Sequence, residues 1–341
     1  MNSYERCMAA IHRKPVDRLP VDLHNFAMCA EASGKHYDAF FLDAQAMARM
    51  QIELQKEYSH DMLLIENGTA TLAEALGCDV AYQQNGVPVA NKPAVDTIED
   101  VKEWKLPENL LESPLLKANL ETVVLLKKYF QNEVFLLGRG DQGPFSLAAE
   151  IYGMDNFLMD IMDEDMEEEI FCLLDYCAEA CICYHKALLE AGAHGTSMGD
   201  STAGPDVLSP AMYEKFAMPY EKKVIDAVHE AGGLISLHIC GNATKILPQM
   251  CSLGADILEI DQKTDLPKAA EVVEGKCTLL GQISPILLKE GTLGEIKEAG
   301  EKTIATIGGK TQTGFIFGPG CALGCSTPKE NVHTLVACVI E

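Results

Sequence analysis

Eight short apolar segments, spaced along the whole chain, constrain the fold more than any other feature of this sequence. They cover residues 19–23, 62–65, 134–138, 195–199, 234–239, 256–260, 278–281 and 314–318. Amphipathic stretches of helical spacing separate most of them, at residues 44–58, 113–129, 166–191 and 210–231. Strand alternating with helix eight times predicts an α/β protein, a (β/α)8 TIM barrel with parallel strands.

The length of 341 residues suits one such barrel, so we expect a single domain over residues 1–341. One segment interrupts the alternation. Residues 73–92 hold Gly77, Gly86 and Pro88 around a short alternating run, which predicts an inserted hairpin after the second strand.

The charge of the chain is strongly acidic, with 51 Asp and Glu against 27 Lys and Arg and a formal net charge of -24. Such a surface repels phosphate backbones and acidic lipids, so neither nucleic acid nor a membrane is expected as a partner. The first residues form no long apolar targeting segment, and no apolar run is long enough to span a bilayer. We therefore expect a cytoplasmic protein.

Polar side chains follow the apolar segments, at the ends where strands of a barrel place their catalytic loops. This set comprises His24, Glu66, Asn67, Arg139, Asp141, Asp200, His238, Cys240, Asp261, Gln282 and Cys321. One polar residue after a strand is ordinary turn chemistry, but the repetition over the barrel predicts an active site at its carboxyl-terminal end.

Three members of this set have the chemistry of a metal site. With a strand period of two, His238 and Cys240 point to the same side, and Cys321 follows the last predicted strand. One imidazole and two thiolates suit Zn2+, and three protein ligands leave one position open for catalysis. Cys325 is an alternative third ligand, and packing of a cysteine-rich core is the alternative to any metal site.

A zinc ion with two thiolate ligands can bind the sulfur or oxygen of a small substrate and keep it anionic near neutral pH. Alkyl transfer and hydrolysis by bound water are both compatible with such a site. The residues alone leave this choice open.

Four motifs give the chain an end-to-end resemblance to a known family. Arg6 and Ala10 precede KPVDRLPV at residues 14–21; the others are GPFSLA at 143–148, GDSTAG at 199–204 followed by LSP at 208–210, and TPKENV at 327–332. Together they resemble the uroporphyrinogen decarboxylase superfamily, whose fold is a (β/α)8 barrel.

The sequence departs from the true decarboxylases at the positions that bind porphyrinogen. Residues 24–29 read HNFAMC and lack the paired arginines of those enzymes, and their aspartate after the second strand is replaced by the run that starts at Glu66. Glu150 stands at their tyrosine and Cys321 at their C-terminal histidine. The His-x-Cys pair and the later PGC resemble instead the zinc-dependent corrinoid methyltransferase branch, which includes methylcobalamin:coenzyme M methyltransferases and O-demethylase components.

The resemblance implies that His238, Cys240 and Cys321 bind Zn2+ and that a methyl group moves between a small methyl donor or acceptor and the cobalt of a corrinoid (cobalamin). The chain has no corrinoid-binding DxHxxG motif, so a separate corrinoid protein would dock at the barrel mouth. Contacts to the substrate or to the metal ligands are expected from Glu66, Glu74, Asp200 and Gln282. Glu66, Glu74 or water remain candidates for the fourth zinc ligand.

The direction of transfer and the substrate stay open among a thiol such as coenzyme M, a methoxylated aromatic, methanol and a methylamine. Two other functions are compatible with the same chain. One is decarboxylation of uroporphyrinogen, which the missing arginines disfavour, and the other is a non-catalytic barrel that binds a thiol or a corrinoid.

Overall fold

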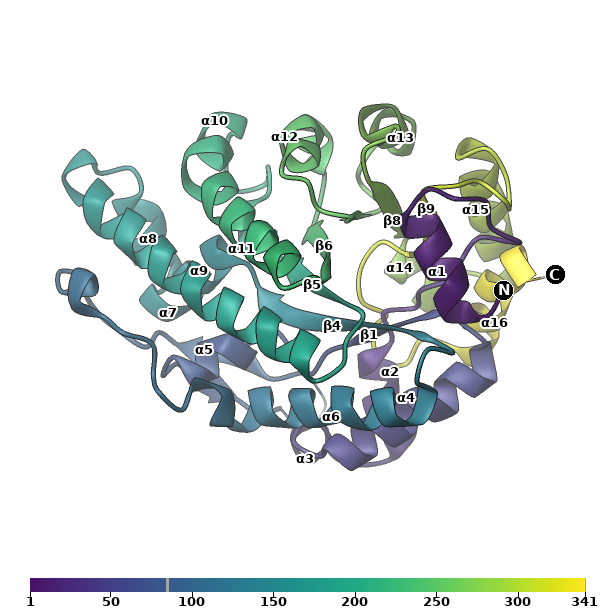
Figure 1. The fold of residues 1–341 in the computed structure, drawn as a ribbon, viewed down its shortest axis with the longest axis horizontal. Helices are drawn as coiled ribbons and strands as arrows, with labels where there is room; N and C mark the ends of the chain where they lie inside the picture. Colours follow the sequence, from purple (N-terminus) through teal and green to yellow (C-terminus); the bar gives the residue numbers. More distant parts are fainter. Residues whose placement is uncertain (84–85, 341) are drawn as a thin grey trace.

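A curled parallel sheet forms the centre of the computed structural model, which describes residues 1–83 and 86–340 (Figure 1). Its strands follow one another in the order β1-β4-β5-β6-β7-β8-β9, and every neighbouring pair is parallel. They are β1 (Met62–Ile65), β4 (Phe135–Gln142), β5 (Gly195–Gly199), β6 (Leu234–Ile239), β7 (Ile257–Ile260), β8 (Thr278–Ile283) and β9 (Phe315–Pro319).

The first predicted strand, residues 19–23, lies where the barrel closes, but it forms only two bridge positions. Val21 bridges to Phe317 of β9 and Asp22 to Met62 of β1, both parallel. The N–H of Asp22 donates to the carbonyl of Phe317 at 3.0 Å, and the N–H of Met62 donates to the carbonyl of Val21 at 3.1 Å. Because Pro20 has no N–H to donate, the segment cannot extend into a regular ladder. The eighth barrel position is thus present and parallel, as predicted, but short.

Strand β4 is the largest departure from the expected strand limits. It was expected to end at residue 138, but it continues to Gln142 and includes Arg139 and Asp141. Its pairing with β5 shifts register between Arg139 and Gln142, and Asp141 has a positive φ of 67°. The polar residues here are therefore part of the strand and lie deep in the barrel.

The predicted helices occur with one interruption. Residues 44–58 form α4 (Ala44–Tyr58), 113–129 correspond to α6 (Pro114–Phe130) and 166–191 to α9 (Glu167–Glu190). Residues 210–231 divide into α10 (Pro210–Met212), a π-helical turn at Tyr213–Ala217 and α11 (Met218–Glu230). Pro219 in the first turn of α11 lacks the N–H that a continuous α-helix would use, which explains the break.

The remaining helices cover the outside of the sheet and its ends (Figure 1). They are α1 (Ser3–Ile11), α2 (Phe26–Ser33), α3 (Tyr37–Phe40), α5 (Thr71–Ala75), α7 (Pro144–Tyr152), α8 (Met154–Asp160), α12 (Leu247–Ser252), α13 (Leu266–Val273), α14 (Pro285–Glu290), α15 (Leu293–Thr306) and α16 (Lys329–Ile340). Short 3-10 turns lie at Val101–Glu103, Leu110–Glu112, Glu164–Met166, Ser201–Ala203 and Ala243–Lys245. In the segment where a hairpin was expected, β2 (Asp79–Ala81) and β3 (Val89–Lys92) pair antiparallel.

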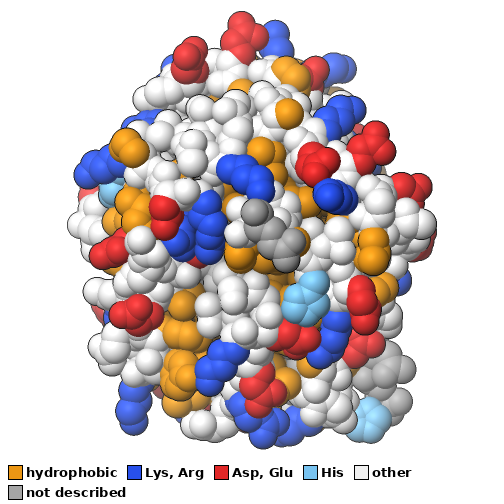
Figure 2. Space-filling view, turned by 90° about the vertical axis from the view of Figure 1, so that its right-hand side faces the viewer, with side chains coloured by type: hydrophobic (Ala, Val, Ile, Leu, Met, Phe, Trp, Pro, Cys, Tyr) orange, Lys and Arg blue, Asp and Glu red, His pale blue; other side chains and the backbone are white. Residues whose placement is uncertain are grey.

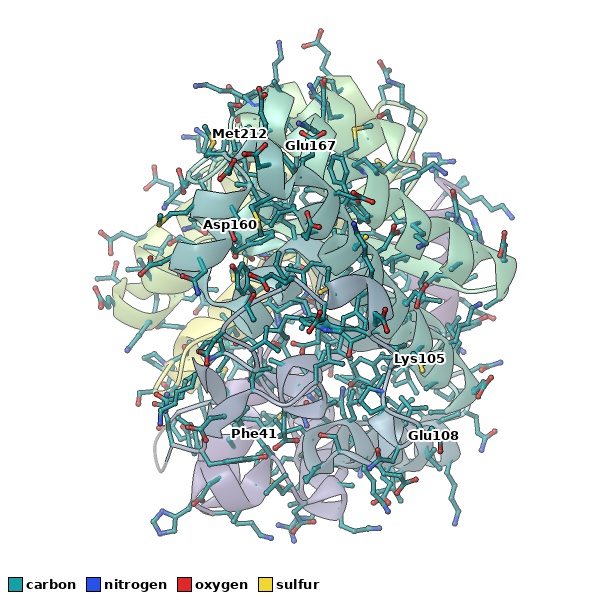
Figure 3. All side chains as sticks on the ribbon, turned by 90° about the vertical axis from the view of Figure 1, so that its left-hand side faces the viewer. Phe41, Lys105, Glu108, Asp160, Glu167 and Met212 are labelled. Carbon is teal, nitrogen blue, oxygen red and sulfur yellow. The ribbon has the colours of Figure 1, made fainter. Side chains whose placement is uncertain are left out.

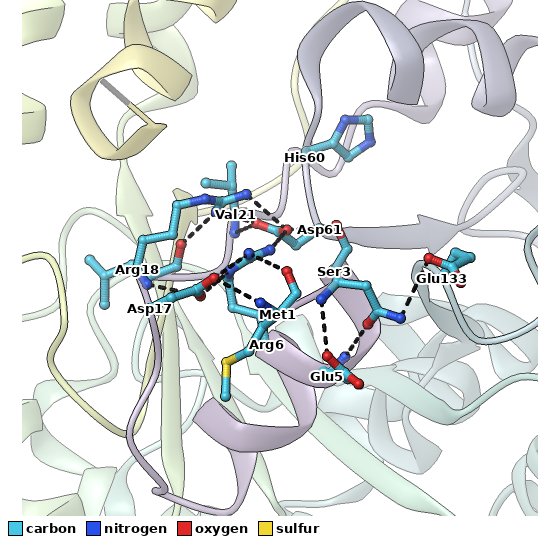
Figure 4. A network of polar contacts seen from close by, with 12 residues as sticks. Met1, Ser3, Glu5, Arg6, Asp17, Arg18, Val21, His60, Asp61 and Glu133 are labelled. Carbon is cyan, nitrogen blue, oxygen red and sulfur yellow. Dashed lines mark hydrogen bonds and ion pairs between the residues drawn. The ribbon is translucent and has the colours of Figure 1, made fainter.

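Buried charges join the N-terminal motif to the barrel (Figure 4). Asp61, just before β1, is fully buried and accepts hydrogen bonds from Arg6 at 2.6 Å, from Arg18 at 2.6 Å and from the N–H of Val21 at 2.9 Å. Arg6 also pairs with the half-exposed Asp17 at 2.7 Å. These ion pairs thus hold residues 19–23, which occupy the eighth barrel position, against the start of β1.

The two ends of the barrel differ in the segments and side chains that lie there. Both chain termini lie at one side of the molecule (Figure 1), and that side carries interspersed positive and negative side chains with small groups of hydrophobic ones between them (Figure 2). The connections that leave the carboxyl ends of the strands lie on the opposite side (Figure 3): Lys105 lies between β1 and β4, Asp160 between β4 and β5, and Met212 between β5 and β6.

In the described part of the chain, no helix is both long enough and apolar enough to cross a membrane.

Candidate metal centre

His238, Cys240 and Cys321 converge at the carboxyl ends of β6 and β9, which are separated in the sheet by β7 and β8. The ligand atoms of the three side chains all lie within 4.8 Å of one another. Nε2 of His238 is 3.0 Å from Sγ of Cys240, and the two sulfur atoms are 3.9 Å apart. Among the described residues, this is the one group of three or more His, Cys, Asp or Glu side chains with such spacing.

The spacing fits a shared tetrahedral ion. With zinc–sulfur bonds of about 2.3 Å, two thiolates on one tetrahedral ion stand about 3.8 Å apart, close to the observed 3.9 Å. The expected nitrogen–sulfur separation is about 3.6 Å, so the His238 ring would move out from its present hydrogen-bond distance. The sulfur atoms are too far apart for a disulfide, and both cysteines are free.

The backbone around the three side chains directs them to one point. His238 is 1% exposed and Cys240 is partly buried directly beyond the last residue of β6. Gly241 follows with a φ of 83°, a conformation that favours glycine, and its N–H donates to Asp261 at 3.1 Å. This tight turn leads the chain away directly after Cys240, the second candidate ligand.

The orientation of the His238 ring suits metal binding. Its Nδ1 lies 3.1 Å from the carbonyl oxygen of Glu259 on the neighbouring strand β7, so this nitrogen donates its proton and Nε2 faces the sulfur atoms. Metal-binding histidines typically have their second ring nitrogen held in this way. The arrangement leaves the Nε2 lone pair available to an ion once the second proton has left.

The pKa values of the three side chains indicate which of them must lose a proton when an ion binds. A hydrogen bond from Cys321, together with the charge of His238, lowers the pKa of Cys240 to about 3, while the same contact and burial raise the pKa of Cys321. Burial lowers the pKa of His238, but the negative charges of Glu259 and Cys240 outweigh it and raise the pKa to about 9. The site without metal therefore holds one thiolate, one thiol and one imidazolium at neutral pH.

A buried ion-pair network borders the candidate metal centre. Nε2 of His24 is 2.7 Å from Glu66, and Nδ1 of His24 is 3.4 Å from Glu259. Arg139 lies 3.9 Å from both glutamates and donates to the hydroxyl of Ser197 at 2.9 Å. Burial opposes the charge on His24, but the two glutamates raise its pKa to about 10, so two cations and two anions balance.

Glu259 is the residue of this network that the sequence prediction missed. It pairs in register with His238 and is 1% exposed. Burial raises its pKa, but His238, His24 and Arg139 outweigh that effect and hold the pKa at about 2. The available signal was a single carboxylate inside the apolar run of residues 257–260, where a charge is costly unless it is paired.

A second residue missed by the sequence prediction is Ser201, which begins the turn after β5. Its hydroxyl donates to Sγ of Cys240 at 3.1 Å. No pattern in the sequence marks this contact, because it depends on two neighbouring strands ending at the same height.

The other residues predicted for the site lie in different environments. The Glu66 carboxylate belongs to the ion-pair network. Glu74 accepts from the hydroxyl of Ser113 at 2.6 Å and from the N–H of Leu115 at 3.1 Å, so it stabilises the start of α6. Cys325, the alternative ligand, lies beside Tyr37 and outside the group of three.

Asp200 and Gln282 hold loops at the same end of the barrel. The Asp200 carboxylate is fully buried and accepts from the N–H groups of Phe145 at 3.2 Å and Ser146 at 2.7 Å, at the N-terminus of α7. Gln282 is within β8 and donates to the carbonyl of Thr264 at 2.8 Å. Both residues position connections around the centre.

Comparison with known proteins gives the chain a family. The family model described as uroporphyrinogen decarboxylase (URO-D) matches residues 2–341. A methylcobamide:CoM methyltransferase, MtbA of Methanosarcina acetivorans, is 30% identical over 98% of this chain and 96% of its own length. A uroporphyrinogen decarboxylase of Carboxydothermus hydrogenoformans is 30% identical over 79% of this chain and 75% of its own length.

A solved structure supports the same relationship. A methyltransferase from Methanosarcina mazei superposes with a TM-score of 0.88 at 25% identity, covering 99% of this chain and 98% of that one. The match confirms the predicted TIM-barrel fold over nearly the full length of the chain. The sequence motifs, the barrel and the family model agree, and the chain belongs to the uroporphyrinogen decarboxylase (URO-D) family.

Proposed function

We propose that this protein is a zinc-dependent methyltransferase that moves a methyl group between the heteroatom of a small substrate and the cobalt of a corrinoid carried by a separate protein. The observation that carries the proposal is the convergence of His238, Cys240 and Cys321 on one point at the catalytic end of the barrel. The names of the full-length relatives, methylcobamide:CoM methyltransferases, support the same reaction class.

The three ligands would hold Zn2+, which supplies Lewis acidity to a thiol, ether or similar group at its open position. The carbonyl of Glu259 keeps the His238 imidazole turned toward the ion site, and the charge-balanced network of His24, Glu66, Arg139 and Glu259 keeps the surrounding groups fixed. We also propose that residues 1–341 act as one barrel domain.

The corrinoid protein would approach the side of the molecule where the connections from the carboxyl ends of the strands lie (Figure 3). For methyl transfer in either direction, the corrinoid of the partner would have to face the substrate heteroatom that His238, Cys240 and Cys321 hold through the metal. The chain itself supplies the substrate site, and the partner supplies the corrinoid.

The test compares Cys321→Ala with Cys325→Ala. Both substitutions remove a partly buried thiol from the same loop, but only Cys321 belongs to the group of three. We expect zinc, measured by metal analysis after purification under reducing conditions, to be near one equivalent in wild type and Cys325→Ala and absent in Cys321→Ala. Demethylation of free methylcobalamin by coenzyme M, followed by absorbance, should disappear together with the zinc.

Two outcomes would contradict the proposal. One is full zinc content in Cys321→Ala. The other is a zinc-loaded wild-type protein that changes the absorbance of neither methylcobalamin with a thiol nor cob(I)alamin with methoxylated aromatics, methanol or methylamines.

A further inference from the structure

The two sulfur atoms of the metal centre differ in their surroundings. Cys240 has the hydroxyl of Ser201 at 3.1 Å in addition to the imidazole of His238 at 3.0 Å. Among the described residues, Cys321 has no hydroxyl partner, and its one side-chain contact within hydrogen-bonding range is Cys240 at 3.9 Å. The centre is therefore asymmetric before any substrate binds.

Three hydrogen-bonded contacts hold the turn that contains Ser201. The N–H of Asp200 donates to the carbonyl of His238 at 2.9 Å, which joins the turn to the strand that carries the ligands. The Asp200 carboxylate binds the start of α7, and the N–H of Thr202 donates to the hydroxyl of Ser146 at 3.0 Å. Ser201 thus reaches Cys240 from a rigid support, as an effective positioning group must.

A hydroxyl that donates to a thiolate withdraws charge from the sulfur. Hydrogen bonds to charged groups are the stronger ones, and a thiolate that is stabilised in this way is a weaker nucleophile. The nucleophilicity of the ligand sulfurs matters in a methyltransferase, because these sulfurs would lie beside the substrate atom and compete with it for the methyl group. Methylation of a ligand would form a sulfur–carbon bond, break the cobalt–carbon bond and leave the electron pair on cobalt.

We propose that Ser201 is a positioning residue whose hydrogen bond to Cys240 lowers the nucleophilicity of that sulfur, so that Cys240 does not compete with the substrate for the methyl group. The proposal rests on the proposed metal site. It assigns the protection to Cys240 and leaves Cys321 as the more reactive of the two sulfurs.

The experiment uses Ser201→Ala, with Ser201→Thr as the variant that keeps the hydroxyl. Thr202→Ala is the matched control, because it removes a neighbouring hydroxyl from the same turn, and Thr202 contacts Ser146 through its backbone N–H instead. Each full-length protein is loaded with Co2+ for absorption spectra and, separately, with Zn2+ for alkylation by iodoacetamide, with the modified cysteines located by mass spectrometry. Alkylation forms a sulfur–carbon bond at the thiolate and releases iodide.

In Ser201→Ala we expect the sulfur-to-cobalt charge-transfer band to move to longer wavelength and alkylation of Cys240 to accelerate about tenfold, with Cys321 unchanged. Ser201→Thr and Thr202→Ala should both resemble wild type. A fold defect alone would not shift the band while the Co2+ stoichiometry is unchanged.

Three results would overturn the inference: an unchanged band and rate in Ser201→Ala, equal acceleration at both cysteines, or the same change in Thr202→Ala. If wild type itself shows no charge-transfer band with Co2+, the proposed metal site is wrong, and this inference is wrong with it. If the band is present but insensitive to Ser201, the proposed function stands and only this inference is lost.

Discussion

Nδ1 of His238 lies 3.1 Å from the carbonyl oxygen of Glu259, and the carboxylate of the same glutamate lies 3.8 Å from that nitrogen. One residue therefore orients a candidate metal ligand through its backbone and affects the charge of that ligand through its side chain. The carboxylate also faces His24 at 3.4 Å and Arg139 at 3.9 Å. Glu259 connects the candidate metal centre to the ion-pair network.

We expect Glu259→Gln to weaken zinc binding by about 10- to 100-fold, because the outer partners of ligating histidines typically contribute that much. The substitution leaves two buried cations facing one carboxylate, so the free energy of unfolding should fall by about 3–5 kcal/mol. Competition with a chromophoric chelator and urea denaturation measure the two effects. Unchanged zinc affinity in a folded variant would show that only the backbone carbonyl matters.

Zinc affinity should fall as the pH falls from 8 to 6. Without metal, the pKa of His238 is raised to about 9 and the pKa of Cys321 is also raised, so both groups are protonated over this range and both protons must leave when zinc binds. Each displaced proton costs about tenfold in apparent affinity per pH unit, which gives about 100-fold per unit for the pair. Chelator competition at several pH values checks the slope, and a pH-independent affinity would contradict the assignment of these two protons.

Asp61→Asn should destabilise the fold strongly. Asp61 is fully buried and compensates both Arg6 and Arg18, so its neutralisation leaves two guanidinium groups without a buried counterion (Figure 4). We expect a loss of about 3–5 kcal/mol in the free energy of unfolding. The control is Asp17→Asn, whose carboxylate is 44% exposed and whose loss should cost below about 1 kcal/mol. Similar urea midpoints for the two variants would show that the buried ion pairs of Asp61 stabilise the fold no more than the exposed pair of Asp17.

Gly199→Ala should disturb the ion-pair network from the next strand. A Cβ at Gly199 would collide with the guanidinium of Arg139, which must then leave its contact with Ser197. Overpacking of this kind costs about 1–3 kcal/mol of stability, measurable by urea denaturation. Gly294→Ala, in α15 with open space around the added methyl, is the control and should be neutral or slightly stabilising. Equal effects of the two substitutions would show that Arg139 can move freely.

The alternation of apolar runs and amphipathic stretches was enough to predict the barrel, because strand and helix periodicities are local properties of the chain. The proximity of His238 and Cys240 was predictable for the same reason, since two residues at the end of one strand keep their spacing in any register. Where the prediction was less accurate, non-local contacts decided the outcome. Strand β4 extends to Gln142 because its end pairs with β5, and residues 19–23 form only two bridges, at Val21 and Asp22, because Pro20 lacks a donor.

The sequence by itself determined which side chains are candidate metal ligands and at which end of the barrel they would lie. Only the tertiary structure decided that Cys321 meets His238 across two intervening strands, that Glu259 and Ser201 complete their surroundings, and that Glu74 and Asp200 anchor helices. The physical reason is that ligand identity depends on the residue itself, whereas distances between strands depend on how the sheet curls and on the height at which each strand ends.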